Sequence, residues 1–278
     1  MAIQSMWKGT IAYRESLVLQ ESLKKELQCA SSDPSRSPQL VFMPNQSGNG
    51  ELHHLLSLGK TLTKTTKLCL YESKELLTKA GAKQDQYNKG TPTAFLIGFE
   101  CPACITLGLR GKEETDLNKA VEEYKKKKIE IVPIKRGGQA TLHSPGQLVI
   151  YPVMSLLQWK IRPREFLSIL EKITQDILEQ YGILAEKREE AAGLFTRKGK
   201  IAFFGIHISG GISQHGLAIN VHNDLKLFNL IRSCGVSRRP HDSFQSYNLC
   251  PNLKEVFSLW CQTAKETFSK HYLKRKGL

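Results

Sequence analysis

The chain has 278 residues, of which 40% are hydrophobic and 24% are charged, an ordinary composition for a globular protein. This length allows one large α/β domain or one domain with an appendage. No run approaches the roughly 18 apolar residues that a transmembrane helix needs. The first twenty residues also lack the continuous apolar segment of a secretory signal. We therefore expect neither a helical membrane protein nor a secreted one.

The formal net charge is +14, which calls for an acidic partner. Nucleic acid is one candidate, but no zinc-finger, RRM or KH signature accompanies the basic residues. The strongest basic run, residues 125–128, is typical of a solvated helix C-terminus. A basic surface would equally favour the docking of an acidic protein. The charge therefore predicts an acidic partner without identifying it, and we do not expect nucleic acid.

The chain contains seven cysteines. Their number is odd and their spacing forms no framework, a pattern typical of free thiols in a reducing compartment. Cys101 and Cys104 form a CxxC pair, but no second pair or histidine stands at ligand spacing, so we expect no metal or redox centre there. Cys250 and Cys261 fall in or near the last predicted helix, where cysteine usually acts as a small apolar residue.

The first third of the chain divides into three stretches. Amphipathic spacing predicts a helix at residues 12–28. Residues 31–50 are rich in Ser, Pro, Asn and Gly and are typical of a loop. Residues 51–91 are rich in lysine and predict at most two short helices. We interpret residues 30–92 as an insertion of unknown role.

The remaining two thirds interleave strands with helices. Apolar runs predict strands at residues 94–99, 129–134, 147–153, 201–208 and 216–221. Helical spacing predicts helices at residues 116–127, 163–181 and 252–271, with Pro163 in the first turn of its helix. Because the elements show no regular βαβ repeat, we predict an α/β (α+β) fold with a mixed β-sheet core flanked by helices.

The most unusual stretch is RGGQATLHSPGQ at residues 136–147, between two predicted strands. Its glycines allow the backbone to approach a ligand closely. Arg136 can bind an anion, and His143 can donate or accept a proton. The GxxxxGK[ST] spacing of a phosphate loop is absent. The alternative is a glycine-rich turn with a solvent-facing arginine.

Two further residues carry nucleophile and base chemistry. Gly199 suggests a tight turn that places Lys200 at the start of an apolar strand, where partial burial fits a lysine for base chemistry. Cys234 stands between Ser233 and Gly235, whose small size leaves the thiol accessible. A nearby cation would stabilise its thiolate. Taken singly, residues of either kind are more often structural than catalytic.

These motifs occur together in one family. Residues 136–147, 200–205 (KIAFFG), 215–221 (HGLAINV) and 233–235 (SCG) together resemble the octanoyltransferases of lipoate biosynthesis, which share a fold with lipoate and biotin ligases. The resemblance covers roughly residues 5–28 and 93–236, and includes a Trp7-x-Gly-x-x-x-Tyr13 start. It implies one octanoyltransferase catalytic domain over residues 1–278, with an atypical insertion at about 30–92.

By this resemblance, Cys234 corresponds to the acyl-accepting cysteine and Lys200 to the lysine that assists it. The implied reaction moves an octanoyl group from octanoyl-acyl carrier protein to Cys234 and then to a lysine of a lipoyl domain. Its acceptors are lipoyl domains of 2-oxoacid dehydrogenases and the glycine cleavage H protein. It is the first step of endogenous protein lipoylation and needs no ATP, metal or other cofactor. The implied acyl-binding positions are Arg136, Gly137, Gly138, Gln139, Ala140, Thr141, Leu142, His143, Phe203, Phe204, Gly205, His215, Gly216, Leu217 and Ala218.

The family pattern begins by Trp7, so we expect a cytoplasmic monomer without an organelle presequence. The chain departs from the pattern at Leu142, usually a tyrosine, at Ser144, usually a glycine, and at Cys101, usually a histidine. None of these changes removes a proposed catalytic group, although Leu142 would alter the wall of an acyl pocket.

Two other functions remain open: an ATP-dependent lipoate- or biotin-type ligase, and a non-catalytic basic binding protein on the same scaffold. Retention of both Cys234 and Lys200 favours the transferase.

Overall fold

The computed structural model describes residues 1–32, 93–188, 191–232 and 240–277. Nearly all of the predicted insertion, residues 30–92, lies outside these ranges, and so does Cys234. Within the described part of the chain, no helix is long and apolar enough to cross a membrane.

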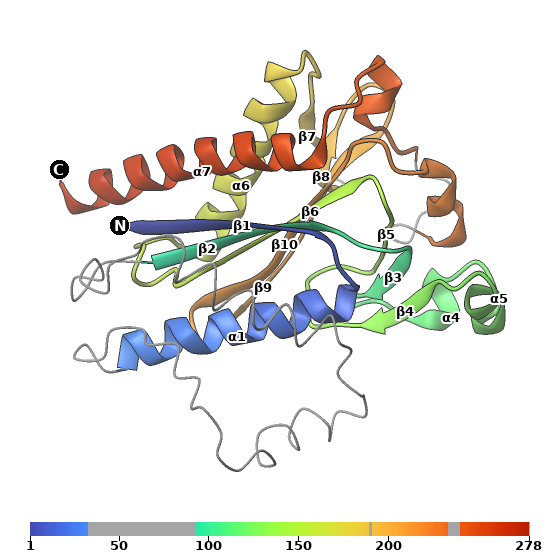
Figure 1. Cartoon of the computed structure of the whole chain (residues 1–278), viewed down its shortest axis with the longest axis horizontal. Helices are drawn as coiled ribbons and strands as arrows, with labels where there is room; N and C mark the ends of the chain where they lie inside the picture. The colour runs from blue at the N-terminus through green and yellow to red at the C-terminus, as the bar shows by residue number, and fades with distance from the viewer. Residues whose placement is uncertain (33–92, 189–190, 233–239, 278) are drawn as a thin grey trace, which may run out of the picture.

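A seven-stranded sheet forms the centre of the molecule (Figure 1). Its β1–β2 pair is parallel, whereas β2–β6, β6–β10, β10–β9, β9–β8 and β8–β7 are antiparallel. The mixed sheet predicted from the sequence is therefore confirmed. Across the sheet, the strands are β1 (Ala2–Thr10), β2 (Thr93–Glu100), β6 (Gln147–Met154), β10 (Ile212–Asn220), β9 (Lys200–Ser209), β8 (Ala191–Phe195) and β7 (Glu186–Arg188).

A smaller sheet of order β4-β3-β5 lies beside one end of the large sheet (Figure 1). Two short helices lie against it in the same view. The chain passes directly from β5 into β6, so the two sheets are connected through residues 144–146. The elements are β3 (Cys104–Leu107), α4 (Glu113–Asp116), α5 (Val121–Lys126), β4 (Glu130–Pro133) and β5 (Ala140–His143).

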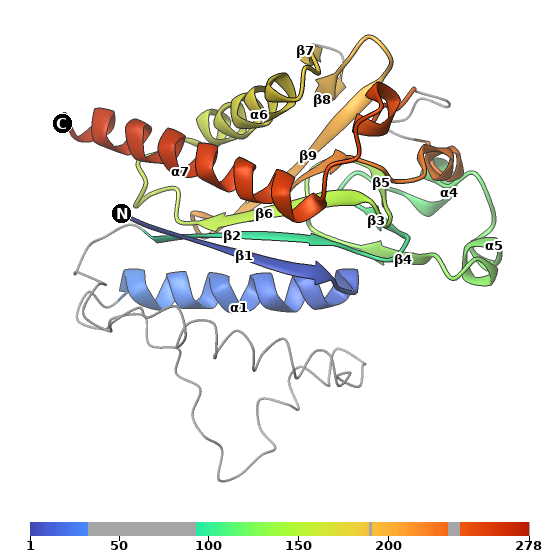
Figure 2. The same ribbon diagram turned by 45° about the horizontal axis from the view of Figure 1, so that its top comes forward.

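Long helices cover the two faces of the large sheet. Helices α6 (Pro163–Gln180) and α7 (Leu253–Lys276) lie on one face, and α1 (Tyr13–Ser32) lies on the other (Figure 2). Pro163 begins α6, where its missing N–H costs no hydrogen bond. The 3₁₀ helices Leu225–Leu230 and Phe244–Tyr247 occupy the connections that follow β10.

Each face of the sheet has its own apolar core. On the α6/α7 face, Trp159 and Trp260 are fully buried, and the Trp260 indole donates a hydrogen bond to Thr174 Oγ1 (3.1 Å). On the α1 face, the core includes Phe95 and Phe99. Because successive side chains of a strand point to opposite faces, each central strand contributes to both cores.

The predicted helix at residues 116–127 is wrong as a continuous element. Helix α4 ends at Asp116, and Leu117 adopts an extended conformation that pairs with Ile231. The next helix, α5, starts at Val121. The pairing of Leu117 with a distant part of the chain overrides the local helical spacing. The other helices and strands predicted within the described residues are confirmed within about five residues, whereas β1, β3, β5, β7 and β8 were not predicted. The short helices predicted in residues 51–91 lie outside the described residues.

Candidate active site

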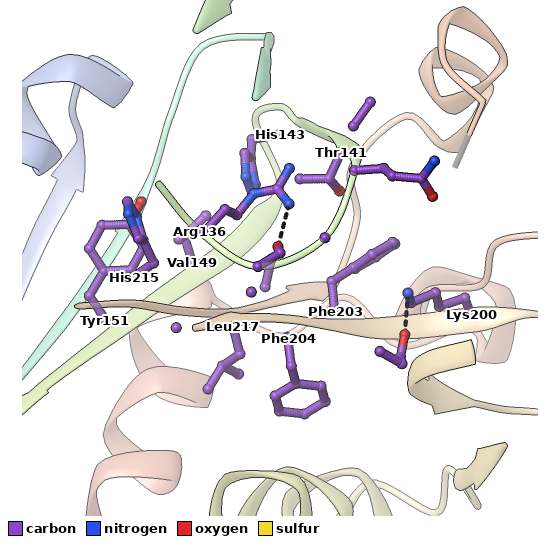
Figure 3. Close-up of a pocket in the computed structure, with 18 of the residues that line it drawn as sticks. Arg136, Thr141, His143, Val149, Tyr151, Lys200, Phe203, Phe204, His215 and Leu217 are labelled. Carbon is purple, nitrogen blue, oxygen red and sulfur yellow. Dashed lines mark hydrogen bonds between the residues drawn. The ribbon is translucent and has the colours of Figure 1, made fainter. Parts of the chain in front are cut away.

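A cavity of about 270 Å³ lies on the α1 face of the large sheet, bordered by β6, β10 and β9 and by the glycine-rich segment before β5 (Figure 3). The cavity brings together nearly all of the residues proposed from the sequence. Those that line it are Arg136, Gly137, Gly138, Gln139, Ala140, Thr141, His143, Lys200, Phe203, Phe204, Gly205, His215, Gly216, Leu217 and Ala218.

Three of the proposed residues do not present side chains to the cavity. Leu142 is fully buried in the core of the α1 face and does not line the cavity, so the expected effect of Leu142 on an acyl pocket wall is not seen in its side chain. Phe204 and Leu217 pack with the core of the α6/α7 face, and Figure 3 shows both side chains pointing away from Arg136. Their main chain, rather than their side chains, borders the cavity.

The glycine-rich segment packs directly on β9. Gly137 N donates to Ile206 O (3.2 Å). A Cβ atom added to Gly205 would lie 2.8 Å from Arg136 Cδ, and one added to Gly108 would lie 2.5 Å from Gly138 O. The absence of side chains at Gly205 and Gly108 therefore allows the glycine-rich segment to contact β9 and the end of β3.

Arg136 is buried, not solvent-facing. Its Nη2 donates to Thr106 O (2.7 Å) and to Thr106 Oγ1 (2.9 Å), and its Nη1 donates to Gly137 O (2.9 Å). These hydrogen bonds hold the guanidinium in place. The alternative of a glycine-rich turn with an exposed arginine is wrong, and the cavity contains a fixed positive charge.

Two buried histidines lie in the cavity wall and are neutral at physiological pH. Burial lowers the pKa of His143 to about 4 and that of His215 to about 3, and the charge of Arg136 contributes to both shifts. His143 shares a 2.7 Å hydrogen bond with Gln147 Oε1 and stacks on Tyr13. His215 has a φ of 57°, and its main-chain N–H donates to Gln20 Oε1. Neither ring supplies a cation to the cavity at pH 7.

Lys200 is the first residue of β9 and is only 3% exposed. Its Nζ donates to Ala192 O (2.5 Å) and lies 4.6 Å from the centre of the Phe203 ring. Gly193 leaves the space for this lysine, because a Cβ atom there would lie 2.4 Å from Lys200 Cε. A carbonyl and an aromatic face thus hold the amine at one end of the cavity (Figure 3).

The described chain on both sides of Cys234 is anchored. On one side, Arg232 N donates to Asp116 O (2.8 Å). On the other, Lys200 N donates to Pro240 O (3.0 Å), and Asp242 N donates to Lys200 O (2.9 Å). The chain that follows Cys234 therefore re-enters the described structure beside the Lys200 main chain.

Five residues of the cavity wall were not predicted from the sequence as part of the site: Tyr13, Arg110, Val149, Tyr151 and Ala192. Val149 and Tyr151 lie two residues apart in a predicted strand, so the period-two rule would have placed them on one face. Tyr13 belongs to the family motif but was not assigned to the site. No sequence signal marks Arg110 or Ala192.

The CxxC pair, Cys101 and Cys104, lies in the core of the α1 face. Both thiols are buried, and their Sγ atoms are 3.9 Å apart. The hydrogen bond with Cys101 and burial raise the pKa of the Cys104 thiol. Among the residues that the structure describes, no group of three His, Cys, Asp or Glu side chains could hold a metal ion.

The arrangement of the sheets and helices defines the class of protein. The chain aligns with a bipartite lipoate protein ligase from Thermoplasma acidophilum, whose structural study also concerns its E2 lipoyl domain. The TM-score is 0.52 at 16% sequence identity, and the alignment covers 64% of this chain and 72% of that one. The fold is that of the lipoate protein ligases.

Sequence comparison narrows the class to a family. The model of the lipoyl protein ligase A/B catalytic domain matches residues 75–270. An octanoyltransferase from Thermoanaerobacter sp. (strain X514) is 32% identical over 72% of this chain and 86% of its own length. One from Dechloromonas aromatica (strain RCB) is 36% identical over 66% and 82%, respectively. The chain belongs to the lipoyl protein ligase A/B family, and its sequence relatives within that family are octanoyltransferases. The chain is an acyltransferase.

Proposed function

We propose that this acyltransferase moves an octanoyl group from octanoyl-acyl carrier protein to a lysine of lipoyl domains, by way of a thioester on Cys234. Its acceptors would be the lipoyl domains of 2-oxoacid dehydrogenases and the glycine cleavage H protein. The observation that carries the proposal is the position of Lys200. Its amine is buried at one end of the cavity, and its main chain pairs with the segment that follows Cys234.

In the first step, the Cys234 thiolate attacks the carbonyl carbon of the carrier thioester. A new S–C bond forms on Cys234, the S–C bond to the carrier breaks, and the proton lost from Cys234 ends on the carrier thiol. One thioester replaces another of similar energy. As an ammonium, Lys200 would stabilise the thiolate that makes this attack.

In the second step, the amine of the incoming lysine attacks the acyl-enzyme. An N–C bond forms, the S–C bond to Cys234 breaks, and the proton of the amine returns to the Cys234 sulfur. As an amine, Lys200 would take this proton and pass it on. The product amide is more stable than the thioester, so the transfer needs no ATP, metal or other cofactor.

The walls of the cavity suit a fatty acyl group. Phe203, Val149 and Ala218 present apolar side chains of the α1-face core to it. The two histidines of the wall are neutral and add no charge to that of the Arg136 guanidinium. The net charge of +14 would speed the docking of acidic carrier and lipoyl domains. We expect a cytoplasmic enzyme that acts as a monomer.

The related fold of a lipoate protein ligase gives the proposal one alternative, an ATP-dependent ligation of a free acid. The test mixes the purified chain with a lipoyl domain and either octanoyl-acyl carrier protein without ATP, or octanoate with ATP and Mg²⁺. We expect intact mass spectrometry to show octanoyl on the lipoyl domain in the first mixture only. Modification in the second mixture only would overturn the transferase and establish the ligase.

A further inference from the structure

Residues 240–242 hold the start of β9, where Lys200 lies. Lys200 N donates a hydrogen bond to Pro240 O (3.0 Å), and Asp242 N donates one to Lys200 O (2.9 Å). Lys200 and His241 also form a parallel β-bridge. Because its N–H and its carbonyl both bond to this one segment, the position of the Lys200 main chain depends on that of residues 240–242.

Asp242 is a fully buried carboxylate in this segment. Its Oδ2 accepts hydrogen bonds from Thr196 Oγ1 and from Tyr247 Oη (2.9 Å), and its Oδ1 accepts one from Ser243 N (2.9 Å). Its main-chain oxygen accepts one from Asn220 Nδ2 (2.9 Å). Burial of a carboxylate is costly unless hydrogen bonds replace its water, so these bonds fix both the side chain and the main chain of Asp242.

Thr196 joins this carboxylate to the turn between β8 and β9. Its Oγ1 accepts a hydrogen bond from Gly199 N (3.3 Å), and its own N–H donates to Gly199 O (2.9 Å). A Cβ atom added to Gly199 would lie 2.6 Å from Pro240 C, so the turn packs main chain against main chain on the segment of Asp242. The carboxylate therefore holds the turn from which Lys200 follows.

The carboxylate and the Lys200 amine have their contacts on different faces of the sheet. Tyr247 packs with the core of the α6/α7 face, whereas the amine lies in the cavity of the α1 face, against Ala192 O and the Phe203 ring (Figure 3). The link between Asp242 and the amine thus runs through the Lys200 main chain. A shift of about 1 Å in such a group can cost roughly a hundredfold in rate.

We propose that Asp242 is a positioning residue for the reaction: its buried carboxylate fixes the main chain of Lys200 and thereby places the Lys200 amine in the cavity. This inference rests on the proposed function, in which that amine assists the acyl transfer. Asp242 acts only through Lys200, so its loss should slow the chemical step without weakening the binding of the carrier protein.

The test measures kcat and KM for octanoyl-acyl carrier protein, with transfer to a lipoyl domain followed by mass spectrometry and the fold checked by circular dichroism. We expect Asp242→Ala to lower kcat about thirtyfold and to change KM less than about twofold. Asp242→Asn keeps the size of the side chain and the acceptor for Ser243 N. The Thr196 and Tyr247 hydroxyls can instead accept from its amide, so kcat should recover to within about fivefold of wild type.

The matched control is Asp224→Ala. Asp224 is an exposed aspartate whose side chain accepts a hydrogen bond from Lys226 N (2.9 Å) at the start of the 3₁₀ helix Leu225–Leu230. Its loss removes a carboxylate and a main-chain contact of the same kind, but leaves residues 240–242 in place. We expect this variant to keep both kcat and KM within about twofold of wild type.

A double-mutant cycle separates the positioning of the amine from support of the fold. If Asp242 acts through Lys200, Asp242→Ala should lower the residual kcat of Lys200→Ala less than about threefold, because the amine that it positions is already absent. A contribution to the fold alone would lower kcat by the same factor in the wild-type and Lys200→Ala backgrounds.

Thr196→Val tests the same link should Asp242→Ala fail to fold. Valine keeps the β-branched shape but lacks the hydroxyl that joins the carboxylate to the turn. We expect a loss of about tenfold in kcat with KM unchanged, and again little further loss in the Lys200→Ala background.

The outcomes separate the two proposals. If the wild-type chain transfers no octanoyl group, or if Lys200→Ala is fully active, the proposed function of the amine fails and the role of Asp242 fails with it. If wild type is active and Lys200→Ala is impaired, but Thr196→Val and folded Asp242→Ala keep the wild-type kcat, the role of Asp242 alone is refuted. An equal loss in both backgrounds of the cycle refutes it as well.

Discussion

The two faces of the large sheet are built from the same strands but have opposite characters. The α6/α7 face is closed by two long helices over a core with fully buried tryptophans. The α1 face keeps a cavity and buries Arg136, His143, Lys200 and His215 around it. A face that served stability alone would not bury these groups, since each must be desolvated. Both faces carry an apolar core, and we infer that the proposed chemistry takes place on the α1 face.

Replacing Lys200 should give the largest change. We expect Lys200→Ala to lower octanoyl transfer at least a hundredfold, the scale of a lost proton-transfer group, while circular dichroism shows an unchanged fold. The matched control is Lys198→Ala, since Lys198 is an exposed lysine two residues away and its loss should change the rate less than about twofold. Full activity in Lys200→Ala would mean that the Lys200 amine neither stabilises the thiolate nor transfers a proton in the reaction.

The two buried histidines of the α1 face, His143 and His215, should make the stability of the protein depend on pH. Their pKa values are lowered in the folded state, to about 4 for His143 and about 3 for His215. The unfolded chain therefore binds more protons below about pH 6.5, and the free energy of unfolding falls with falling pH by up to about 1.4 kcal/mol per unit per histidine.

Urea unfolding at pH 7, 6 and 5 measures this dependence. Burial raises the pKa of Glu26 to about 7, which adds a slope of the opposite sign, so the histidine contribution is read from the difference between wild type and variant. In a plot of the free energy of unfolding against pH, we expect the slope for His143→Asn to be smaller than the wild-type slope by up to about 1.4 kcal/mol per pH unit, the contribution of one titrating proton. His222→Asn, at an exposed histidine, should keep the full slope. Equal slopes in wild type and His143→Asn would contradict the neutral, buried state of this ring.

Neighbouring phenylalanines on β9 test the two faces directly. Phe203 lines the cavity and contacts the Lys200 amine, whereas Phe204 packs with the core of the α6/α7 face. We expect Phe203→Leu to lower octanoyl transfer about tenfold, because the amine loses the aromatic face that holds it. Phe204→Leu should lower the free energy of unfolding by about 1 kcal/mol and leave the rate within twofold. A similar loss of rate in both variants would break the division between the faces.

The smallest effect should come from the cap of α7. Asn252 Oδ1 accepts a hydrogen bond from Lys254 N (2.8 Å) at the start of this helix. Asn252→Ala should lower the free energy of unfolding by about 1 kcal/mol without changing the rate of transfer. Thermal melting and the transfer assay check the two halves of this prediction, and Asn252→Asp, which keeps the cap, should restore the melting temperature.

The helices and strands that could be predicted are those whose pattern of apolar residues is contained within the element itself. Helix α6 shows a clear apolar spacing and a proline at its first position, and the central strands are apolar runs. The break after α4 could not be predicted, because it depends on the pairing of Leu117 with Ile231, more than a hundred residues away. The short strands β3 and β5 were missed for a similar reason, since their pairing defines them more than their composition.

The same distinction applies to the candidate site. The glycine-rich segment and Lys200 stand out in the sequence because their unusual residues are close together in the chain. Tyr13 and Tyr151 do not, because only the sheet and the packing of α1 bring them to one cavity. The period-two rule gives the strand face of Tyr151, and Tyr13 belongs to the family motif, but only the packing of distant segments places the two residues at one cavity.

The acyl-enzyme on Cys234 is the central claim, and one measurement tests it most directly. The purified chain is mixed with octanoyl-acyl carrier protein, without a lipoyl domain, and its intact mass is recorded. We expect wild type and Cys250→Ala, a control at an exposed cysteine, each to gain one octanoyl group, and Cys234→Ala to gain none. A covalent octanoyl group on Cys234→Ala would contradict the account.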